Sequence, residues 1–98
     1  MTIDSRKSGT TLTLAIAGRL DTTTAPQLEA KLGEVLTDVT ELILDCEALE
    51  YVSSAGLRVI LKAQKKMNVL GSMKVIHVNE AIMEIFDITG FADILTIE

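Results

Sequence analysis

The middle of the chain reads Leu42-Ile43-Leu44-Asp45-Cys46-Glu47-Ala48-Leu49-Glu50-Tyr51-Val52-Ser53-Ser54-Ala55-Gly56-Leu57. Its apolar start predicts a short buried strand that ends at Asp45, followed by a loop that runs through Val52. Apolar residues then recur with helical spacing, which predicts a helix from about residue 54 to 70, stopped by Gly71. A buried strand followed by an amphipathic helix is typical of an α/β domain.

The sequence before this stretch predicts an antiparallel strand pair and a first helix. Residues 11–17 alternate between large apolar and small side chains, and this period of two indicates a strand with unlike faces. The turn signal Ser8-Gly9 predicts that residues 2–7 form its antiparallel edge partner. A helix is expected from Thr24, a candidate N-cap, to about residue 37.

The sequence after the stretch predicts two more strands around a third helix. Residues 75–78 form an apolar run, Asn79 can cap a helix that Gly90 stops, and residues 94–97 form a last strand. The predicted order is β-β-α-β-α-β-α-β, an α/β fold with a mixed, mostly parallel sheet and an antiparallel N-terminal strand. We expect one domain over residues 1–98, whose last strand could be an exposed edge able to pair with another chain.

Composition excludes several classes of partner. The chain has 98 residues, 14 acidic and 9 basic side chains, a net charge of −5 and 3% aromatic residues. Nucleic acids and anionic membrane surfaces are therefore unsuitable main partners, and base-stacking platforms are nearly absent. Cys46 is the single cysteine, which excludes an internal disulfide and fits a reducing compartment. We expect a cytoplasmic protein without a signal peptide or a membrane span.

The charges are unevenly distributed along the chain. Residues 32–57 hold six acidic and no basic side chains, whereas residues 58–79 hold five basic and no acidic ones. The two blocks meet where the predicted second helix begins. The carboxyl ends of the strands, where α/β sheets commonly bind ligands and partners, carry Asp21, residues 45–54 and residues 77–79. The charge junction therefore lies on the expected functional edge.

The predicted second helix has two unlike faces. Its apolar arc consists of Leu57, Ile60, Leu61, Ala63, Met67 and Leu70. Ala55 projects into the opposite, basic arc, made of Arg58, Lys62, Lys65 and Lys66. Ser53 and Ser54 stand at the helix start, where N-capping alone would explain either of them. A solvated surface would likewise explain the basic arc.

Three segments resemble the STAS domains of anti-sigma factor antagonists. Residues 45–57 resemble the family signature, in which a strand ends in Asp and the motif Asp-Ser-Ser/Thr-Gly-Leu opens a helix. Residues 18–28 resemble the family's first strand-to-helix turn, and residues 79–91 resemble its last helix. The resemblance covers essentially the whole chain, in order and without insertion.

The resemblance implies a partner-switching function. The unphosphorylated domain would bind an anti-sigma factor, usually a serine protein kinase, and thereby release a sigma factor for transcription. In typical members the kinase phosphorylates the Ser or Thr just before the motif glycine. The phosphate adds roughly −1.5 to −2 charges within the interface, which breaks the complex.

This sequence departs from the family pattern at the acceptor. Ala55 stands immediately before Gly56 and has no hydroxyl, and Ser53 replaces the usual Asp. Three explanations stay open: the domain is held in its binding form, Ser53 or Ser54 has become the acceptor, or the partner is not a kinase. The expected partner-binding residues are Asp21, Ser53, Ser54, Ala55, Gly56, Arg58 and Lys62.

Other chemistry has weaker support. Cys46 and His77 both lie near strand ends, but the acidic neighbours of Cys46 disfavour the thiolate that a catalytic pair needs. One cysteine and one histidine lack the spacing of a zinc site, and the acidic run around Asp45 is typical of a solvated loop. We expect no catalytic residue, cofactor or metal. The rival to an anti-sigma factor antagonist is a sensor or scaffold STAS domain, which would bind a small ligand or nucleotide at the strand-end edge.

Overall fold

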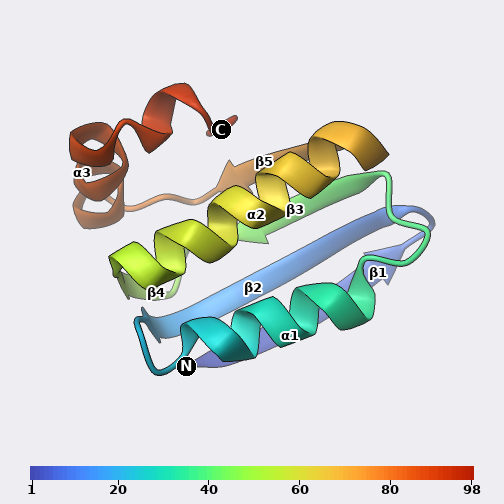
Figure 1. The fold of residues 1–98 in the computed structure, drawn as a ribbon, viewed down its shortest axis with the longest axis horizontal. Helices are drawn as coiled ribbons and strands as arrows, with labels where there is room; N and C mark the ends of the chain where they lie inside the picture. Colours follow the sequence, from blue (N-terminus) through green and yellow to red (C-terminus); the bar gives the residue numbers. More distant parts are fainter.

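The computed structural model describes all residues, 1–98, as one mixed sheet with helices (Figure 1). In chain order the elements are β1 (Thr2–Ser8), β2 (Thr11–Leu20), α1 (Ala25–Val35), β3 (Glu41–Asp45), β4 (Leu49–Val52), α2 (Ser54–Leu70), β5 (Ser72–Ile76), α3 (Glu80–Thr89) and the short 3-10 helix η1 (Phe91–Asp93).

The sheet has the predicted fold class. Its strand order is β1-β2-β3-β5, and β4 continues the sheet by pairing with β2 beyond the end of β3. β1 is antiparallel to β2, and every other pairing is parallel. The α/β class and the antiparallel N-terminal strand are therefore confirmed. Because β2, β3, β4 and β5 run in the same direction, their carboxyl ends share one edge of the sheet.

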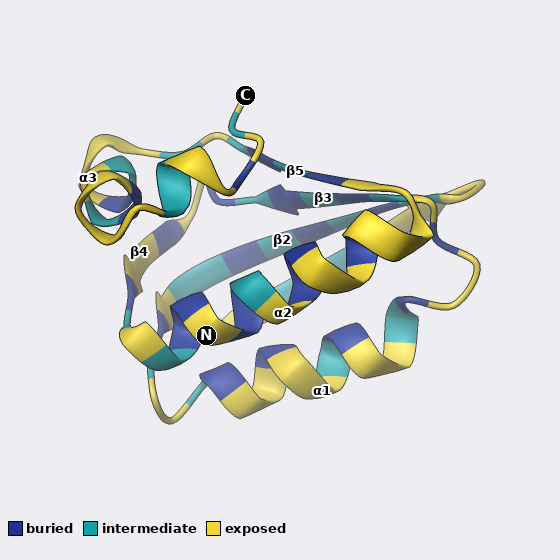
Figure 2. Ribbon diagram, turned by 45° about the horizontal axis from the view of Figure 1, so that its top comes forward, coloured by how far each residue is buried: buried dark blue, intermediate teal, exposed yellow.

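α1 and α2 cover one face of the sheet, and the core lies between these two layers (Figure 2). Alternate residues of β2 are buried, as the period of two predicts, and Leu12, Leu14 and Ile16 point to the helices. The intervening residues, among them Thr11 and Thr13, are only half-buried and lie on the opposite face. We call this face, which no helix covers, the open face.

Two predicted elements are wrong. Residues 49–52, expected in a loop, form β4, because β2 extends past Asp45 and offers free backbone groups to the next segment. Residues 94–97, expected as a strand, follow η1 and make a single parallel bridge between Ile97 and Val75. The strand expected at 75–78 is shifted as well, since β5 ends at Ile76 and His77 takes a left-handed conformation with φ 57°.

The three predicted helices are present, with one correction at the start of α1 and another to the inward face of α2. Thr24 stands at the N-cap of α1 but makes no side-chain capping hydrogen bond, and its hydroxyl instead donates to the Arg19 carbonyl at 2.8 Å. α2 spans residues 54–70 as predicted, and Asn79 caps α3 by accepting a hydrogen bond from the Ile82 amide at 2.9 Å. Val59, left out of the predicted apolar arc, is buried, whereas Leu70 is 42% exposed. The buried arc is wider than expected because α2 contacts both α1 and the sheet. No helix combines the length and the apolar character that crossing a bilayer would require.

Candidate functional site

The start of α2 lies at the carboxyl edge of the sheet, as the sequence predicts. Ser53 is its N-cap, and the Ser53 hydroxyl accepts a hydrogen bond from the Gly56 amide at 3.3 Å. The Ser53 amide donates to the Leu20 carbonyl at 2.8 Å, which ties the helix start to the end of β2. The capping explanation therefore holds for Ser53, whereas Ser54 is exposed and makes no side-chain hydrogen bond to the protein.

Gly56 has a packing function at this helix start. A Cβ atom on Gly56 would lie 2.7 Å from Leu20 Cγ and 2.9 Å from the Leu20 carbonyl oxygen. Only glycine lets the first turn of α2 approach β2 so closely. Gly56 is buried, unlike the other residues predicted to face a partner, so its contribution to the surface is indirect.

Ala55 lies in a shallow hollow between the two helices. The hollow measures about 240 Å³. It is lined by residues of α2, of the N-terminal part of α1 and of the turn before α1: Thr22, Ala25, Pro26, Glu29, Ala55, Arg58, Val59 and Lys62. Ala55 itself is half-buried and packs partly against the core. Sequence reasoning missed the α1 side of this hollow, because which helices become neighbours depends on tertiary structure.

The two predicted basic residues of this hollow differ in their partners. Lys62 Nζ lies 2.9 Å from Glu29 Oε1, a pair that joins α2 to α1 at the surface. Arg58 is exposed and belongs to none of the six ion pairs in the structure. Arg58 is therefore the cation here that is free to pair with an incoming acidic group.

Asp21 is engaged in the turn that begins α1. Asp21 Oδ1 accepts hydrogen bonds from the Thr23 hydroxyl at 2.8 Å and from the Thr23 amide at 3.0 Å. The Thr23 hydroxyl and the amides of Thr23 and Thr24 stabilise the charged form and hold the Asp21 pKa below its ordinary value. Asp21 thus fixes the loop beside the hollow, which is compatible with its expected place at the rim.

A second cluster forms where β3 and β5 end side by side. His77 Nδ1 lies 2.9 Å from Asp45 Oδ1, and Glu47 Oε2 is 3.9 Å from the same ring nitrogen. The hydrogen bond to Asp45, then its charge, raises the His77 pKa above its ordinary value. Burial of Asp45 favours its neutral form, but hydrogen bonds from His77 and Glu47 outweigh burial and lower its pKa.

The same cluster is where metal or nucleophilic chemistry would be expected. Ligand atoms of Asp45, Glu47 and His77 lie within 4.8 Å of one another, close enough to share a metal ion, although the ion pair itself explains their contact. Cys46 is buried, and burial, with a smaller contribution from the Asp45 charge, raises its pKa to about 12. A neutral, buried thiol cannot act as the nucleophile of a pair with His77.

The Asp45–His77 pair predicts a pH dependence. The raised His77 pKa gives stability that is complete below pH 6.5, its ordinary value, and is lost as the pH rises through the folded value. The lowered Asp45 pKa gives stability that is present above pH 3.8 and is lost as the pH falls further. The pair therefore stabilises the fold most between these two ordinary values. Asp45→Asn should lower the His77 titration midpoint toward 6.5, measured by NMR of the single histidine ring.

A matched variant separates the two carboxylates of this cluster. Glu47→Gln should move the His77 midpoint less than Asp45→Asn does, since Glu47 lies farther away and its side chain is 80% exposed. An unchanged midpoint in Asp45→Asn would contradict the ion pair.

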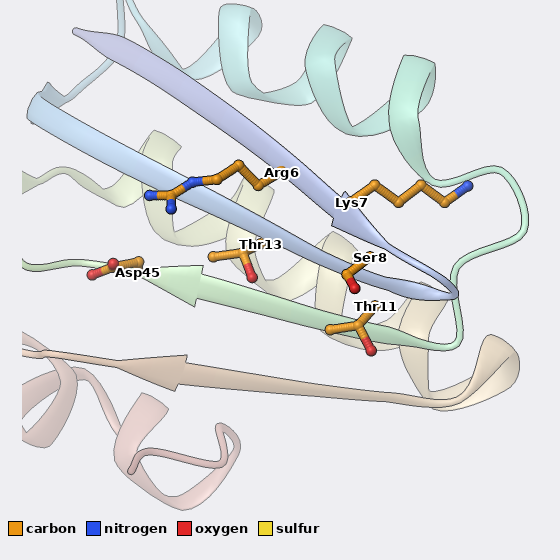
Figure 3. Close-up of a pocket in the computed structure, with 6 residues that line it drawn as sticks. All are labelled: Arg6, Lys7, Ser8, Thr11, Thr13 and Asp45. Carbon is orange, nitrogen blue, oxygen red and sulfur yellow. The ribbon is translucent and has the colours of Figure 1, made fainter.

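The largest hollow lies elsewhere, on the open face of the sheet (Figure 3). It measures about 540 Å³ and is lined by Arg6, Lys7, Ser8, Thr11, Thr13 and Asp45, without a hydrophobic residue. An apolar pocket with a few polar groups is the usual form of a small-molecule site. This hollow lacks that form, so it gives no support to the small-ligand alternative.

Comparison with known proteins agrees with this geometry. The family model described as STAS domain matches residues 2–98. A putative anti-sigma factor antagonist, BtrV of Bordetella bronchiseptica, is 34% identical over 88 residues, covering 88% of this chain and 76% of that protein. The anti-sigma-B factor antagonist of Bacillus subtilis is 32% identical over 98 residues, covering 97% and 88% of the two chains.

A solved structure supports the fold independently. The crystal structure of an anti-sigma factor antagonist from Mycobacterium paratuberculosis superimposes with a TM-score of 0.88 at 24% identity, covering 98% of this chain and 83% of that one. This solved structure thus has the same overall fold as the chain. With the family match over residues 2–98, these likenesses establish that the chain belongs to the STAS domain family.

Proposed function

We propose that this chain is an anti-sigma factor antagonist that binds an anti-sigma factor through the start of α2. The two relatives described above are named for that activity, one of them as a putative member. Anti-sigma factor antagonists of this family act by binding and are not enzymes, which agrees with the class expected from the sequence. We define the α2-start surface as Asp21, Ser53, Ser54, Ala55, Arg58 and Lys62, with Gly56 buried beneath it.

The position of Ala55 carries this proposal. Ala55 lies in a hollow between two helices, in the first turn of α2, and the unpaired Arg58 lines the same hollow. A small apolar side chain in a hollow with a cation at its edge suits a protruding partner side chain flanked by acidic groups. The same residue occupies the family's acceptor position.

We further propose the nature of the partner and the place of action. The unpaired Arg58, with Lys62 held by Glu29 beside it, fits an acidic group on an anti-sigma factor of the serine-kinase type. Binding would withdraw that protein from its sigma factor, which would then be free for transcription in the cytoplasm.

The switch differs from the family pattern. Without a hydroxyl, Ala55 cannot accept a phosphate, so we propose that the domain is held in its binding form. Of the two remaining serines, Ser53 is half-buried and bonded to the Gly56 amide, whereas Ser54 is exposed. Ser54 is therefore the better candidate for an alternative acceptor.

A binding measurement with and without ATP tests this proposal. The purified chain, titrated into a kinase-type anti-sigma factor, should bind equally with and without ATP. Ala55→Ser should bind equally well without ATP. After incubation with ATP it should carry one phosphate by mass spectrometry and bind at least about tenfold more weakly, because a phosphate adds roughly two negative charges.

Two outcomes would overturn the proposal. Absence of binding by the unmodified chain would remove the proposed partner. Phosphate on the unmodified chain, located to Ser54 by comparing Ser54→Ala, would show that the switch has moved and that the domain is not held in one form.

A further inference from the structure

The two edge strands of the sheet, β5 and β1, differ in whether their outer backbone groups are hydrogen-bonded. At the β5 edge, the Val75 amide donates to the Thr96 carbonyl at 2.8 Å and the Glu98 amide donates to the Val75 carbonyl at 2.9 Å. The C-terminal residues thus bond to that edge at Val75, whereas the sequence predicted a last strand over residues 94–97 that could itself be an exposed edge. At the other edge, β1 pairs with β2 alone over its seven residues. β1 is therefore an edge strand with one side unpaired, and it has neither a bulge nor a proline (Figure 1).

The hydrogen bonds of β2 show which groups of β1 face outward. The carbonyl of Thr10, the residue just before β2, accepts a hydrogen bond from the Thr40 amide, and the Gly18 amide donates to the Ala48 carbonyl. The backbone groups of even-numbered residues in β2 therefore point toward β3 and β4. Odd-numbered residues of β2 then bond toward β1, where the register pairs them with even-numbered residues. The amides and carbonyls of Ile3, Ser5 and Lys7 consequently point away from the sheet.

Two opposite charges flank the centre of this edge. Asp4 and Arg6 stand on either side of Ser5, and their register partners in β2 are Ala15 and Thr13, which belong to the open face. Figure 3 shows Arg6 and Thr13 on this face. Their side chains are 71% and 77% exposed and lie 3.8 Å apart. The order acid, serine, base is self-complementary, because an antiparallel copy presents base, serine, acid.

We propose that two copies of this chain pair through β1, antiparallel and centred on Ser5. In this register Ser5 faces the partner's Ser5, and Ile3 faces the partner's Lys7. Three hydrogen-bonded residue pairs, with two bonds each, give about six backbone bonds. Asp4 lies directly opposite the partner's Arg6, in the closely spaced, non-hydrogen-bonded position where cross-strand side chains interact most.

Charge also excludes the neighbouring registers. The outward backbone groups belong to odd-numbered residues, and these must face odd-numbered residues of the other copy. The two nearest alternative registers that meet this condition are centred on Asp4 and on Arg6. Centred on Asp4, two carboxylates would face each other, and centred on Arg6, two guanidinium groups would do so. Charged side chains usually protect an edge strand from pairing, and here their order instead selects one register.

Sedimentation equilibrium over a wide concentration range tests the dimer. The unmodified chain should form a dimer, and Asp4→Arg or Arg6→Asp should each weaken it at least about tenfold, because the symmetry places two like-charge pairs in the interface. The double variant Asp4→Arg/Arg6→Asp restores opposite charges at both places and should restore the dimer. Glu84→Arg on α3 and Lys65→Asp on α2 make the same charge changes at exposed positions outside β1 and should have no effect.

A backbone variant tests the pairing itself. Ser5→Pro removes an amide that points outward and leaves the ladder between β1 and β2 intact, so the fold should persist by NMR while the dimer is lost. A chain that is monomeric at all concentrations would overturn the proposal. So would a dimer that the two single charge changes leave unaltered, or one that the double variant fails to restore.

Discussion

Gly71→Ala is expected to destabilise the fold by about 3 kcal/mol or more, the largest stability effect of a single methyl group in this chain. A Cβ atom on Gly71 would overlap the carbonyl oxygen of Thr40, and it would also lie 2.8 Å from the Thr40 carbonyl carbon. Because these atoms belong to the backbone, a side-chain rotation cannot relieve the overlap. The Ser72 amide donates to the same carbonyl at 2.9 Å, and the Gly71 amide donates to the Met67 carbonyl at 2.7 Å. The end of α2 is thereby held against the start of β3, so relief would require both segments to move.

Urea denaturation of three alanine variants checks this expectation. Gly33 has no atom within 4 Å of a built Cβ and lies in α1, so Gly33→Ala should stabilise the fold by about 0.5–1 kcal/mol. Gly56→Ala should fall between the two, because the Leu20 side chain can partly yield whereas its carbonyl cannot. For Gly71→Ala, a loss of about 3 kcal/mol corresponds to a Tm lower by roughly 12–24 °C. Wild-type stability in that variant would contradict the close packing of this turn.

Local patterns predicted the elements whose signals are contained within a few residues. The alternation of residues 11–17 gave β2, and capping residues at both ends gave the bounds of α2 and the start of α3. In each case the physical cause, a half-buried strand or a helix end that needs hydrogen bonds, acts on neighbouring residues. Such causes can be recognised without knowing the fold.

Elements that depend on distant partners could not be predicted in this way. β4 has buried residues only at its ends, Leu49 and Val52, so no period of two marks it as a strand. Residues 94–97 have the sequence pattern of a strand. They directly follow η1, however, and only Ile97 forms a bridge to β5. Both outcomes depend on where β2 and β5 end relative to their neighbours.

The candidate site shows the same division. Sequence placed Ser54, Ala55 and Arg58 together at a helix start, because they belong to one turn of one helix. Glu29, which pairs with Lys62, and Asp45, which pairs with His77, come from other elements. The charge junction indicated the start of α2 as a candidate surface, whereas only the packing of α1 on α2 revealed that Ala55 lies in a hollow.

Ala55→Asp is expected to weaken binding of the anti-sigma factor at least about 100-fold, which is about 2.7 kcal/mol. The new carboxylate would lie in the hollow beside Arg58, where it would compete with the partner's acidic groups for that cation and repel them. It would also lose water on binding, and desolvation of a carboxylate is costly. Calorimetric titration into the anti-sigma factor measures the loss.

The fold itself should not suffer from this substitution, and a matched control makes that visible. Ala55 is the second residue of α2, and the exposed Ala81 is the second residue of α3, each two residues after its N-cap. A carboxylate in the first turn of a helix stabilises it by about 0.3–1 kcal/mol, so both Ala55→Asp and Ala81→Asp should unfold at slightly higher urea concentration.

In the binding measurement, only Ala55→Asp should lose the partner, and the uncharged Ala55→Asn should keep most of the affinity. If Ala55→Asp and Ala81→Asp bind alike, the α2-start surface is not the interface. If Ala55→Asn binds as weakly as Ala55→Asp, the larger side chain blocks the partner by its size, and charge is not the cause of the lost affinity.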